Sequence, residues 1–423
     1  MTETDMKKEK RMELLAPAGG LETLKTAVLY GADAVYMGGT AYGLRAKARN
    51  FDRGEMQEAV AFAHAHGVKV HVTVNIIAHD RNLEGLEEYL KLLEQIHVDA
   101  LIMADAGMIM TARQTVPDME IHLSTQASAT NYATFNFWHK MGVSRVVCAR
   151  ELSLDEIAEI RRKTDPSLEI EAFAHGAMCI SISGRCLLSN YLAGRDSNQG
   201  LCAHPCRWQY RLVEETRPGE YFPITEGEEG TYIFNSKDLC MIEHLPQMEE
   251  AGINSIKIEG RMKSPLYVAM VTRVYREALD DLAQSRSLYE SKKEYYKHLL
   301  GLVSHRSYTT GFYLGRPGPD EQVYDSADYI RHVDFAGVVR DTHKEEDKDS
   351  FHAGMCLIEQ RGKFVKGDTL YLLGQRGGLI PFTAARILNT EGCEVESAPH
   401  AQEKLYLTMP EQARQDMVFV KEL

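Results

Sequence analysis

The chain has 423 residues, of which 44% are hydrophobic and 26% are charged, and its formal net charge is −13 at pH 7. This composition excludes a disordered chain and allows one large domain with a smaller second one. It also argues against a sequence-independent grip on nucleic acid over the whole surface, because phosphate binding relies on Lys and Arg. A local basic patch is compatible with the negative total.

No segment has the length and apolar character of a membrane-spanning helix, and the N-terminus carries charges but no apolar core of a secretory signal. We therefore expect a soluble, cytoplasmic protein that has no membrane partner. In that compartment thiols stay reduced, so clustered cysteines are expected to bind metal or take part in catalysis rather than to form disulfides.

Short apolar runs alternate with amphipathic stretches from residue 12 onward, which is the pattern of repeated βα units and a parallel sheet. Eight strands are predicted, at residues 13–18, 32–38, 68–75, 100–105, 120–126, 145–150, 169–175 and 255–260. Helices are predicted at residues 54–66, 83–97, 153–163 and 265–282. Ser153 and Glu156 form a capping box at the start of one helix. Eight units indicate an α/β fold, a TIM-barrel-like (β/α)8 domain, with an open doubly wound sheet as the alternative.

In a TIM barrel the chemistry lies at the carboxyl-terminal ends of the strands, so the loops that follow them should line the active site. The segments expected there are residues 17–19, 38–50, 75, 105, 124–126, 150–151 and 259–261, with the long loop after strand seven. In the second loop, Arg45 and Arg49 can bind a carboxylate or phosphate bidentately, although a solvated turn explains them equally well.

Four further side chains are candidates for catalysis at this predicted mouth. Gln126 ends the fifth strand and offers polar groups to the cavity, and His175 ends the seventh. Glu259 and Arg261 follow the eighth strand and can orient a substrate or form ion pairs. For His175 the alternative to substrate contact is a buried, hydrogen-bonded histidine.

The loop after strand seven holds half of the eight cysteines: Cys179, Cys186, Cys202 and Cys206, with Cys240 further on. Thiolates are soft, charged donors, and four of them can saturate a zinc ion or an iron–sulfur cluster. The segment contains no CxxC pair, so spacing alone leaves a metal site and scattered buried cysteines both open. The position of the loop at the predicted mouth favours metal.

The pattern changes after residue 285, which suggests three parts. Residues 1–285 would form the barrel with a cysteine-rich insertion at about 176–240, and residues 286–333 a helical, turn-rich linker. From 334 to 423 the runs are short, alternating and β-rich, which predicts a small C-terminal antiparallel β-barrel.

The run EAFAHGAMCISISGRCLLS, residues 171–189, resembles the signature of peptidase family U32, the collagenase-like protease family. Further matching segments are ELLAPAGGLETLKTAVLYGADAVYMGG, HLSTQASATN, SNQGLCAHPCRW, FNSKDLCMI, SIKIEGRMKSPLYVA and RSYTTGFYLG. The resemblance covers nearly the whole chain. It is strongest to the branch of tRNA hydroxylation proteins, which form 5-hydroxyuridine at the wobble position of tRNA and depend on prephenate.

This resemblance implies an oxygen-sensitive [4Fe-4S] cluster. By position its ligands would be Cys179, Cys186, Cys202 and Cys240, with Cys206 as the rival for the third place. The implied reaction is the hydroxylation of the wobble uridine, dependent on prephenate and independent of oxygen.

The same resemblance implies partners. The anticodon loop of tRNA would enter the barrel mouth, prephenate would be the small carboxylated cosubstrate, and a homologous partner chain would share the RNA surface. We expect prephenate to bind Arg45 and Arg49. RNA phosphates are expected to contact Arg361, Lys363 and Lys366 of the C-terminal domain.

Two alternatives stay open at this point. One is a metal-dependent peptidase, as the family name says, although the HExxH, GxSxG and Walker motifs are absent from the sequence. The other is a non-catalytic partner subunit that carries a cluster or binds RNA for a separate catalytic protein.

Overall fold

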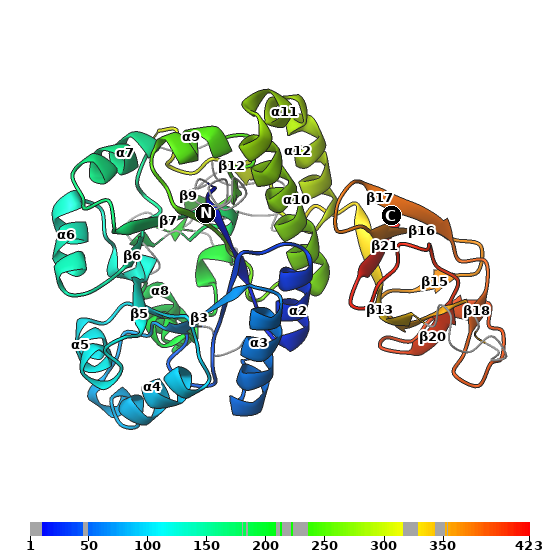
Figure 1. Cartoon of the computed structure of the whole chain (residues 1–423), viewed down its shortest axis with the longest axis horizontal. Coiled ribbons are helices and arrows are strands. Elements are labelled where there is room, and N and C mark those ends of the chain that lie inside the picture. Colours follow the sequence, from blue (N-terminus) through cyan, green and yellow to red (C-terminus); the bar gives the residue numbers. More distant parts are fainter. Residues whose placement is uncertain are drawn as a thin grey trace.

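The computed structural model describes residues 11–44, 50–179, 181–182, 185–208, 212–213, 221–222, 236–315, 329–342, 352 and 354–423. A ring of strands surrounded by helices forms the larger domain, and an antiparallel β domain lies beside it (Figure 1). The two domains follow each other in the chain, as the sequence predicts.

The barrel is closed and parallel. Its strands are β1 (Glu13–Pro17), β2 (Ala34–Met37), β3 (Lys69–Val74), β4 (Ala100–Met103), β5 (Glu120–Leu123), β6 (Arg145–Val147), β7 (Glu169–Ala177) and β11 (Ser255–Ile258). Each pairs with the next, and β11 pairs with both β1 and β7, which closes the ring. All eight predicted strands and the TIM-type fold are confirmed, and the open doubly wound sheet is wrong.

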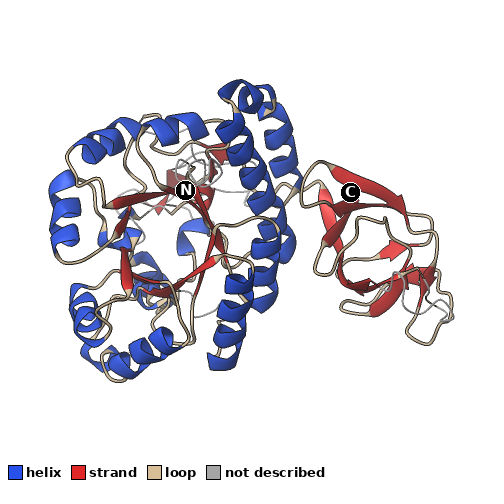
Figure 2. Ribbon diagram, viewed as in Figure 1, coloured by secondary structure: helices blue, strands red, loops and turns tan. Residues whose placement is uncertain are grey.

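The helices form the outer layer of the barrel (Figure 2). They are α2 (Leu21–Leu29), α3 (Arg53–Ala65), α4 (Leu86–Gln95), α5 (Ala106–Thr115), α6 (Tyr132–Lys140), α7 (Leu154–Arg162), α9 (Leu245–Glu250) and α10 (Pro265–Gln284). The predicted capping box begins α7: the Glu156 amide donates to Ser153 Oγ, and the Glu156 carboxylate accepts from the Ser153 amide. Because helices cover the sheet from outside, the strands are buried almost throughout.

Part of the segment expected to be a linker packs onto the barrel domain. Helices α11 (Arg286–Ser291) and α12 (Lys293–Leu302) lie against α10, and their Tyr289 and Tyr296 are buried in the barrel core. Strand β12 (Tyr308–Thr309) pairs with β10 (Asp238–Cys240), which in turn runs antiparallel to β7. These segments extend the barrel sheet beyond its ring.

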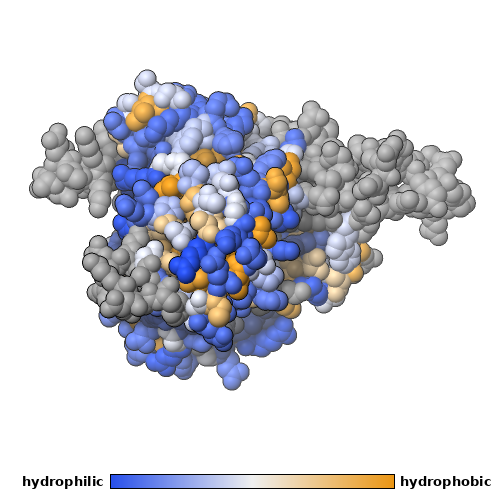
Figure 3. All heavy atoms as spheres, turned by 90° about the vertical axis from the view of Figure 1, so that its right-hand side faces the viewer, coloured by the Kyte–Doolittle hydropathy of each residue, from blue (hydrophilic) through white to orange (hydrophobic). Residues whose placement is uncertain are grey.

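The C-terminal domain has its own apolar core and an antiparallel sheet, as predicted. Its strands are β13 (Val333–Thr342), β14 (Cys356–Gln360), β15 (Phe364–Val365), β16 (Thr369–Leu373), β17 (Leu379–Thr383), β18 (Ile387–Leu388), β19 (Ser397–Ala398), β20 (Lys404–Leu407) and β21 (Val418–Glu422). Seven follow the order β17-β16-β21-β13-β14-β20-β18, and β15 pairs with β19. The face turned to the viewer in Figure 3 mixes hydrophilic and hydrophobic side chains.

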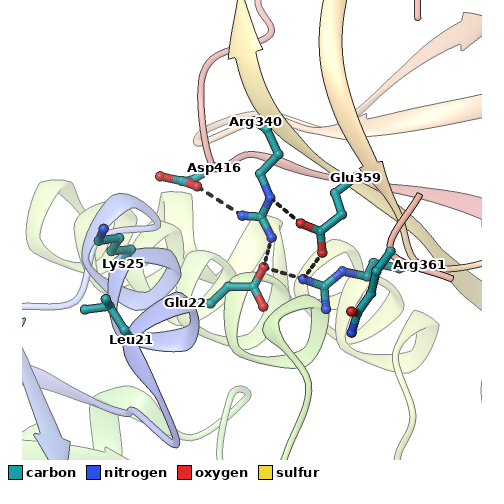
Figure 4. A pocket seen from close by; sticks show the side chains of 8 residues that line it. Leu21, Glu22, Lys25, Arg340, Glu359, Arg361 and Asp416 are labelled. Atoms are coloured by element: carbon teal, nitrogen blue, oxygen red, sulfur yellow. Dashed lines mark hydrogen bonds and ion pairs between the residues drawn. The ribbon is translucent and has the colours of Figure 1, made fainter. Parts of the chain in front are cut away.

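A continuous core and a group of ion pairs join the two domains. The buried hydroxyl of Tyr30, the residue that follows α2, donates to the Leu373 carbonyl (2.9 Å) and accepts from the Val418 amide (3.2 Å). Beside it, Glu22 of α2 points toward Arg340 of β13 and Arg361 after β14, and forms ion pairs with both (Figure 4). The β domain is therefore anchored to the first helix of the barrel.

Candidate active site

The carboxyl-terminal end of the barrel gathers polar side chains, as the loop positions predict. Asn75 follows β3, and the Ser124 and Gln126 positions follow β5. The Asn75 Nδ2 and the Gln126 backbone amide both lie 3.4 Å from Ser124 Oγ, to which they donate. One hydroxyl therefore holds together the loops that follow two different strands.

Arg261 ties the strand ends together from the other side. Its buried guanidinium donates to Thr73 Oγ1 (3.2 Å) near the end of β3 and to Asn50 Oδ1 (2.8 Å) in the loop after β2. A Cβ atom at Gly38 would lie 2.2 Å from Arg261 Nη2, so the glycine is required for this close approach. Arg261 is thus a buried positive charge at the mouth.

Glu259 lies next to Arg150 across the β6, β7 and β11 strand ends. Arg150 Nη2 is 3.5 Å from Glu259 Oε2, Nη1 donates to the Ala177 carbonyl, and the guanidinium lies 3.9 Å from the centre of the Phe173 ring. Gly176 adopts φ +106°, and a Cβ there would lie 2.4 Å from the Glu259 carbonyl oxygen. The missing side chain lets β7 and β11 approach closely at this point.

His175 is buried within a group of tyrosines. Its Nδ1 lies 3.4 Å from the Tyr275 hydroxyl, and the rings of Tyr267 and Tyr308 lie within 6.1 Å and 5.4 Å of its own. Burial lowers the pKa of His175 to about 3, helped by the neighbouring positive charges. The imidazole is therefore neutral at pH 7. Because Cys240 pairs with His175 in the β7–β10 ladder, this aromatic group connects the barrel to a predicted thiolate ligand.

The cysteine loop is fastened to the barrel mouth at two places. Arg185 Nε donates to the Gln126 carbonyl (2.6 Å) after β5. Ile77, after β3, donates its amide to the Asn198 carbonyl (3.2 Å) and accepts from Gln199 Nε2. Helix α8 (Leu188–Ala193), which belongs to this loop, is visible behind the ring of strands in Figure 1. The loop therefore covers the carboxyl-terminal ends of the strands.

Several of the thiols accept hydrogen bonds or lie near donors. The Leu188 amide donates to Cys186 Sγ (3.3 Å), and the His204 amide donates to Cys202 Sγ (3.4 Å). Cys240 Sγ lies 4.0 Å from the Tyr275 hydroxyl, and burial raises the pKa of this thiol to about 12. Donors directed at sulfur are typical of thiolates that hold iron–sulfur clusters, where they tune the reduction potential.

The predicted ligands at the two ends of the cysteine loop lie in different surroundings. Cys179 is exposed just beyond β7, and Cys206 lies in the turn Pro205–Arg207. In the described part of the chain no three His, Cys, Asp or Glu side chains gather closely enough to hold a single metal ion. A cubane cluster takes one thiolate per iron, so its ligands stand further apart than those of one ion. The four predicted cysteines equal the number of thiolates that such a cluster takes, and the ligand assignment stays a prediction.

The remaining predicted residues lie elsewhere. Arg45 and Arg49 lie outside the described residues. In the C-terminal domain Arg361 forms ion pairs with Glu22 and with Glu359 (Figure 4). The other two predicted RNA contacts are exposed: Lys366 pairs with Glu394 and Glu396, and Lys363 is open to solvent.

Sequence reasoning missed the tyrosines of α10 and the anchors of the cysteine loop. Tyr267 and Tyr275 are eight positions apart, which places them on one helical face, so the periodicity of α10 held a signal for the first group. The anchors Ile77 and Asn198 carry no such signal, because an ordinary backbone bond joins them.

The opposite end of the barrel interior holds a buried ion network. Arg145 forms ion pairs with Glu13 (2.5 Å), Glu169 (2.6 Å) and Glu171 (3.2 Å), and Lys257 pairs with Glu171 (2.9 Å). Burial raises the pKa of Glu171, but Lys257 and Arg145 outweigh it and hold that pKa below its ordinary value. Lys257 is therefore an ion-pair partner inside the barrel rather than a group at the mouth.

Two buried histidines complete the barrel interior. The rings of His71 and His122 meet edge to face, with centres 4.7 Å apart. Burial lowers the pKa of both, so both are neutral at pH 7.

Known proteins match this chain over most of its length. The model of peptidase family U32 matches residues 19–323, and that of the U32 C-terminal domain matches residues 331–418. The chain is 43% identical to tRNA hydroxylation protein P1 of Bacillus subtilis (strain 168), over 92% of this chain and 90% of that protein. It is 38% identical to tRNA hydroxylation protein P of Escherichia coli (strain K12), over 94% of each chain.

A third relative is named for the modification of a different RNA. This is a 23S rRNA 5-hydroxycytidine synthase of Escherichia coli (strain K12), 35% identical over 76% of this chain and 48% of that protein. Among the helices that the structure describes, none has the length and apolar character needed to cross a membrane. By its two family matches and its relatives, the chain belongs to peptidase family U32.

Proposed function

We propose that this protein is an RNA hydroxylase that converts the wobble uridine of tRNA to 5-hydroxyuridine. The observation that carries this proposal is the 43% identity, over 92% of the chain, to a protein named for tRNA hydroxylation. A further relative is named for 5-hydroxycytidine in 23S rRNA. Hydroxylation at C5 of a pyrimidine base is therefore the chemistry that best fits this chain.

The position of the cysteine loop at the barrel mouth suits an oxidation of the base. Replacing the hydrogen on C5 by a hydroxyl removes two electrons from the base, so the reaction needs redox chemistry close to the substrate. The cysteine loop lies over the strand ends and is bonded to the Gln126 and Ile77 carbonyls. A base in the mouth would therefore lie next to the thiols.

We also propose that Cys179, Cys186, Cys202 and Cys240 hold a [4Fe-4S] cluster, with Cys206 as the rival of Cys202. The amide hydrogen bonds to the sulfurs of Cys186 and Cys202 support thiolate ligands at these positions. When bound, the cluster would supply one-electron transfer at the mouth.

Prephenate is the proposed cosubstrate, and the prephenate-dependent hydroxylation would not require oxygen. It carries two carboxylates, which suit bidentate binding by the guanidinium groups of Arg45 and Arg49. For the tRNA backbone, Lys363 is the most accessible of the three predicted contacts, because Arg361 and Lys366 already pair with glutamates. A homologous partner chain would extend this small basic surface.

The nucleosides of tRNA test the function directly. Bacillus subtilis (strain 168) has two related proteins, named P1 and P2, so the host strain should lack all of its own U32 relatives. We expect 5-hydroxyuridine in tRNA to be absent from this host under anaerobic growth and to return when the protein is expressed. Unchanged 5-hydroxyuridine in the two strains would refute the proposed function.

The cluster requires a separate measurement. Anaerobically purified protein should contain iron and sulfide in equal amounts and show broad visible absorption, and Cys186→Ser should lose both. Cys393→Ser is the matched control, because Cys393 is an exposed thiol of the C-terminal domain. Stoichiometric zinc without colour would refute the cluster and favour the peptidase alternative.

A further inference from the structure

The main chain of Cys186 is held by one short turn of the cysteine loop, the 3-10 turn η4 (Ser197–Gln199). The Cys186 amide donates to Asn198 Oδ1 (3.3 Å), and Asn198 Nδ2 donates to the Cys186 carbonyl (3.3 Å). Ser197 Oγ donates to the same carbonyl. The Asn198 carboxamide therefore pairs with both polar main-chain groups of Cys186, as the facing residue of an antiparallel strand would.

The two partners fix the orientation of this carboxamide. A main-chain amide can only donate and a main-chain carbonyl can only accept, so an inverted Asn198 side chain would bring like groups together at both contacts. Because both contacts belong to one residue, they restrict the position of Cys186 and also the rotation of its backbone.

The same turn is bonded to the loop that follows β3. The Ile77 amide donates to the Asn198 carbonyl (3.2 Å), and the Gln199 carboxamide donates to the Ile77 carbonyl. The side chain of Asp196 begins the turn by accepting from the Asn198 amide (2.8 Å). Asn198 thus lies between Cys186 on one side and the barrel mouth on the other.

The backbone of Cys186 also determines where its sulfur lies. The Leu188 amide donates to Cys186 Sγ (3.3 Å), and a bond between residues only two positions apart depends closely on the local backbone angles. On the other side of Cys186, Arg185 Nε donates to the Gln126 carbonyl (2.6 Å) of the mouth. A group that holds the Cys186 main chain therefore also maintains the hydrogen bond to its sulfur.

We infer that Asn198 is a positioning residue, which holds Cys186 at the barrel mouth and maintains the Leu188 hydrogen bond to its sulfur. This inference rests on the proposed function for the role of Cys186 as a cluster ligand, and it adds how that ligand is held. Hydrogen bonds to the sulfurs help to set the reduction potential of an iron–sulfur cluster. Because such a bond offsets part of the negative charge on the sulfur, it favours the reduced cluster.

Hydrogen exchange, followed by mass spectrometry on the anaerobically purified protein, tests the contact itself. In wild type the peptide that contains the Cys186 amide should be protected. Asn198→Ala removes both of its bonds to Cys186, so this amide should exchange about 10-fold faster, which is the size expected for two ordinary hydrogen bonds. Exchange at the wild-type rate would overturn the inference.

The reduction potential tests the positioning role. In a redox titration followed by visible absorption, the cluster of Asn198→Ala should titrate at a more negative potential than that of wild type. Asn198→Gln keeps the carboxamide on a longer side chain, so its potential and exchange rate should lie between those of Asn198→Ala and wild type. It decides the outcome if Asn198→Ala binds too little iron to titrate. Wild-type potentials in the two variants would overturn the inference.

Asn389→Ala is the matched control, because Asn389 holds the main chain of a cysteine in the C-terminal domain. Its Oδ1 accepts from the Cys393 amide (2.8 Å), and its own amide donates to the Cys393 carbonyl (2.9 Å). Its substitution should speed exchange at Cys393 and leave the reduction potential unchanged.

The same measurements separate this inference from the proposed cluster. Faster exchange at Cys186 in Asn198→Ala, in a protein that contains no iron, would refute the cluster alone. A cluster in wild type, with unchanged exchange and potential in Asn198→Ala, would refute the role of Asn198 alone.

Discussion

The two ends of the barrel interior differ in how their buried polar groups are paired. At the amino-terminal end, Glu13, Glu171, Arg145 and Lys257 are buried or nearly so and neutralise one another at short distances. At the carboxyl-terminal end, Asn75 and Gln126 keep buried oxygens that accept no hydrogen bond from the described residues. The first arrangement matches every charge with an opposite one and suits stability, whereas the second leaves polar atoms without a partner among the described residues.

This difference agrees with the general separation of stabilising and functional residues in TIM barrels. Residues at the amino-terminal end act on stability, and those at the carboxyl-terminal ends of the strands act on substrates. Here the division can be tested, because each end offers substitutions with distinct expected effects. Substitutions in the ion network at the amino-terminal end of the barrel should change the unfolding free energy. Substitutions at the mouth should change binding and catalysis.

The largest effect on stability is expected in the ion network at the amino-terminal end of the barrel. Lys257→Met leaves the fully buried Glu171 with Arg145 as its only described ion-pair partner. Breaking a buried ion pair on one side typically costs about 3–5 kcal/mol, and urea unfolding should show a loss of that size. Lys25→Met removes a surface pair with Glu58 and should cost less than about 1 kcal/mol. Similar losses of unfolding free energy in the two variants would contradict a special role of the buried ion network in stability.

The contact between the domains comes next. Tyr30→Phe removes one hydroxyl that serves both the Leu373 carbonyl and the Val418 amide, so it should cost about 2 kcal/mol. Calorimetry should then show the β domain unfolding before the barrel. Tyr289→Phe is the control, because its hydroxyl makes the same kinds of bonds inside the barrel domain, to Ile242 and Leu245. Separate transitions in the control as well would show that Tyr30 does not couple the domains.

Acid sensitivity should come from the buried histidines. Burial lowers the pKa of His71 well below its ordinary value, with further lowering by His122 and Arg145. The unfolded chain therefore binds a proton near pH 6.5 that the folded chain does not, so stability is full above that pH and falls as the pH decreases. His71→Leu should reduce this slope by about 1.4 kcal/mol per pH unit between pH 6 and 5. An unchanged slope would show that His71 titrates normally.

The smallest effect is expected at the partly exposed ion pairs between the domains. Glu22 contacts both Arg340 and Arg361, next to a pocket of about 400 Å³ (Figure 4). Glu22→Gln should lower stability by less than about 1 kcal/mol and only at low salt, because such pairs are screened. It should also remove one of the two carboxylates that pair with Arg361, leaving Glu359, and so strengthen the binding of tRNA. Weaker binding would argue against Arg361 as an RNA contact.

The sequence predicts the barrel well because its signal is periodic and local. Each strand, such as residues 100–105, is a short apolar run bounded by turn residues. The capping box of Ser153 predicts where the following helix begins. The packing of α11 and α12 on α10 was not predictable in this way. Their charged faces resemble a linker, and only tertiary contacts of Tyr289 and Tyr296 bring them into the barrel core.

The sequence predicts where the candidate site lies in the barrel, but not which side chains hydrogen-bond to one another there. Strand order alone places Asn75, Gln126 and Arg261 at one end of the barrel. That Ser124 holds Asn75, or that Arg261 reaches Thr73 across the mouth, depends on contacts between residues far apart in the chain. Local pattern carries no information on such contacts.

We propose that the cysteine loop over the mouth carries the RNA chemistry, whereas the ion network at the amino-terminal end of the barrel only supports the fold. The most direct test is the amount of 5-hydroxyuridine in tRNA from a host without U32 proteins that expresses wild type or Cys186→Ser at equal protein levels. Wild type should restore the nucleoside, and Cys186→Ser should not, although the cluster-free forms of the two proteins unfold at the same urea concentration. Full restoration by Cys186→Ser would show that the hydroxylation does not need this thiol or a cluster bound to it.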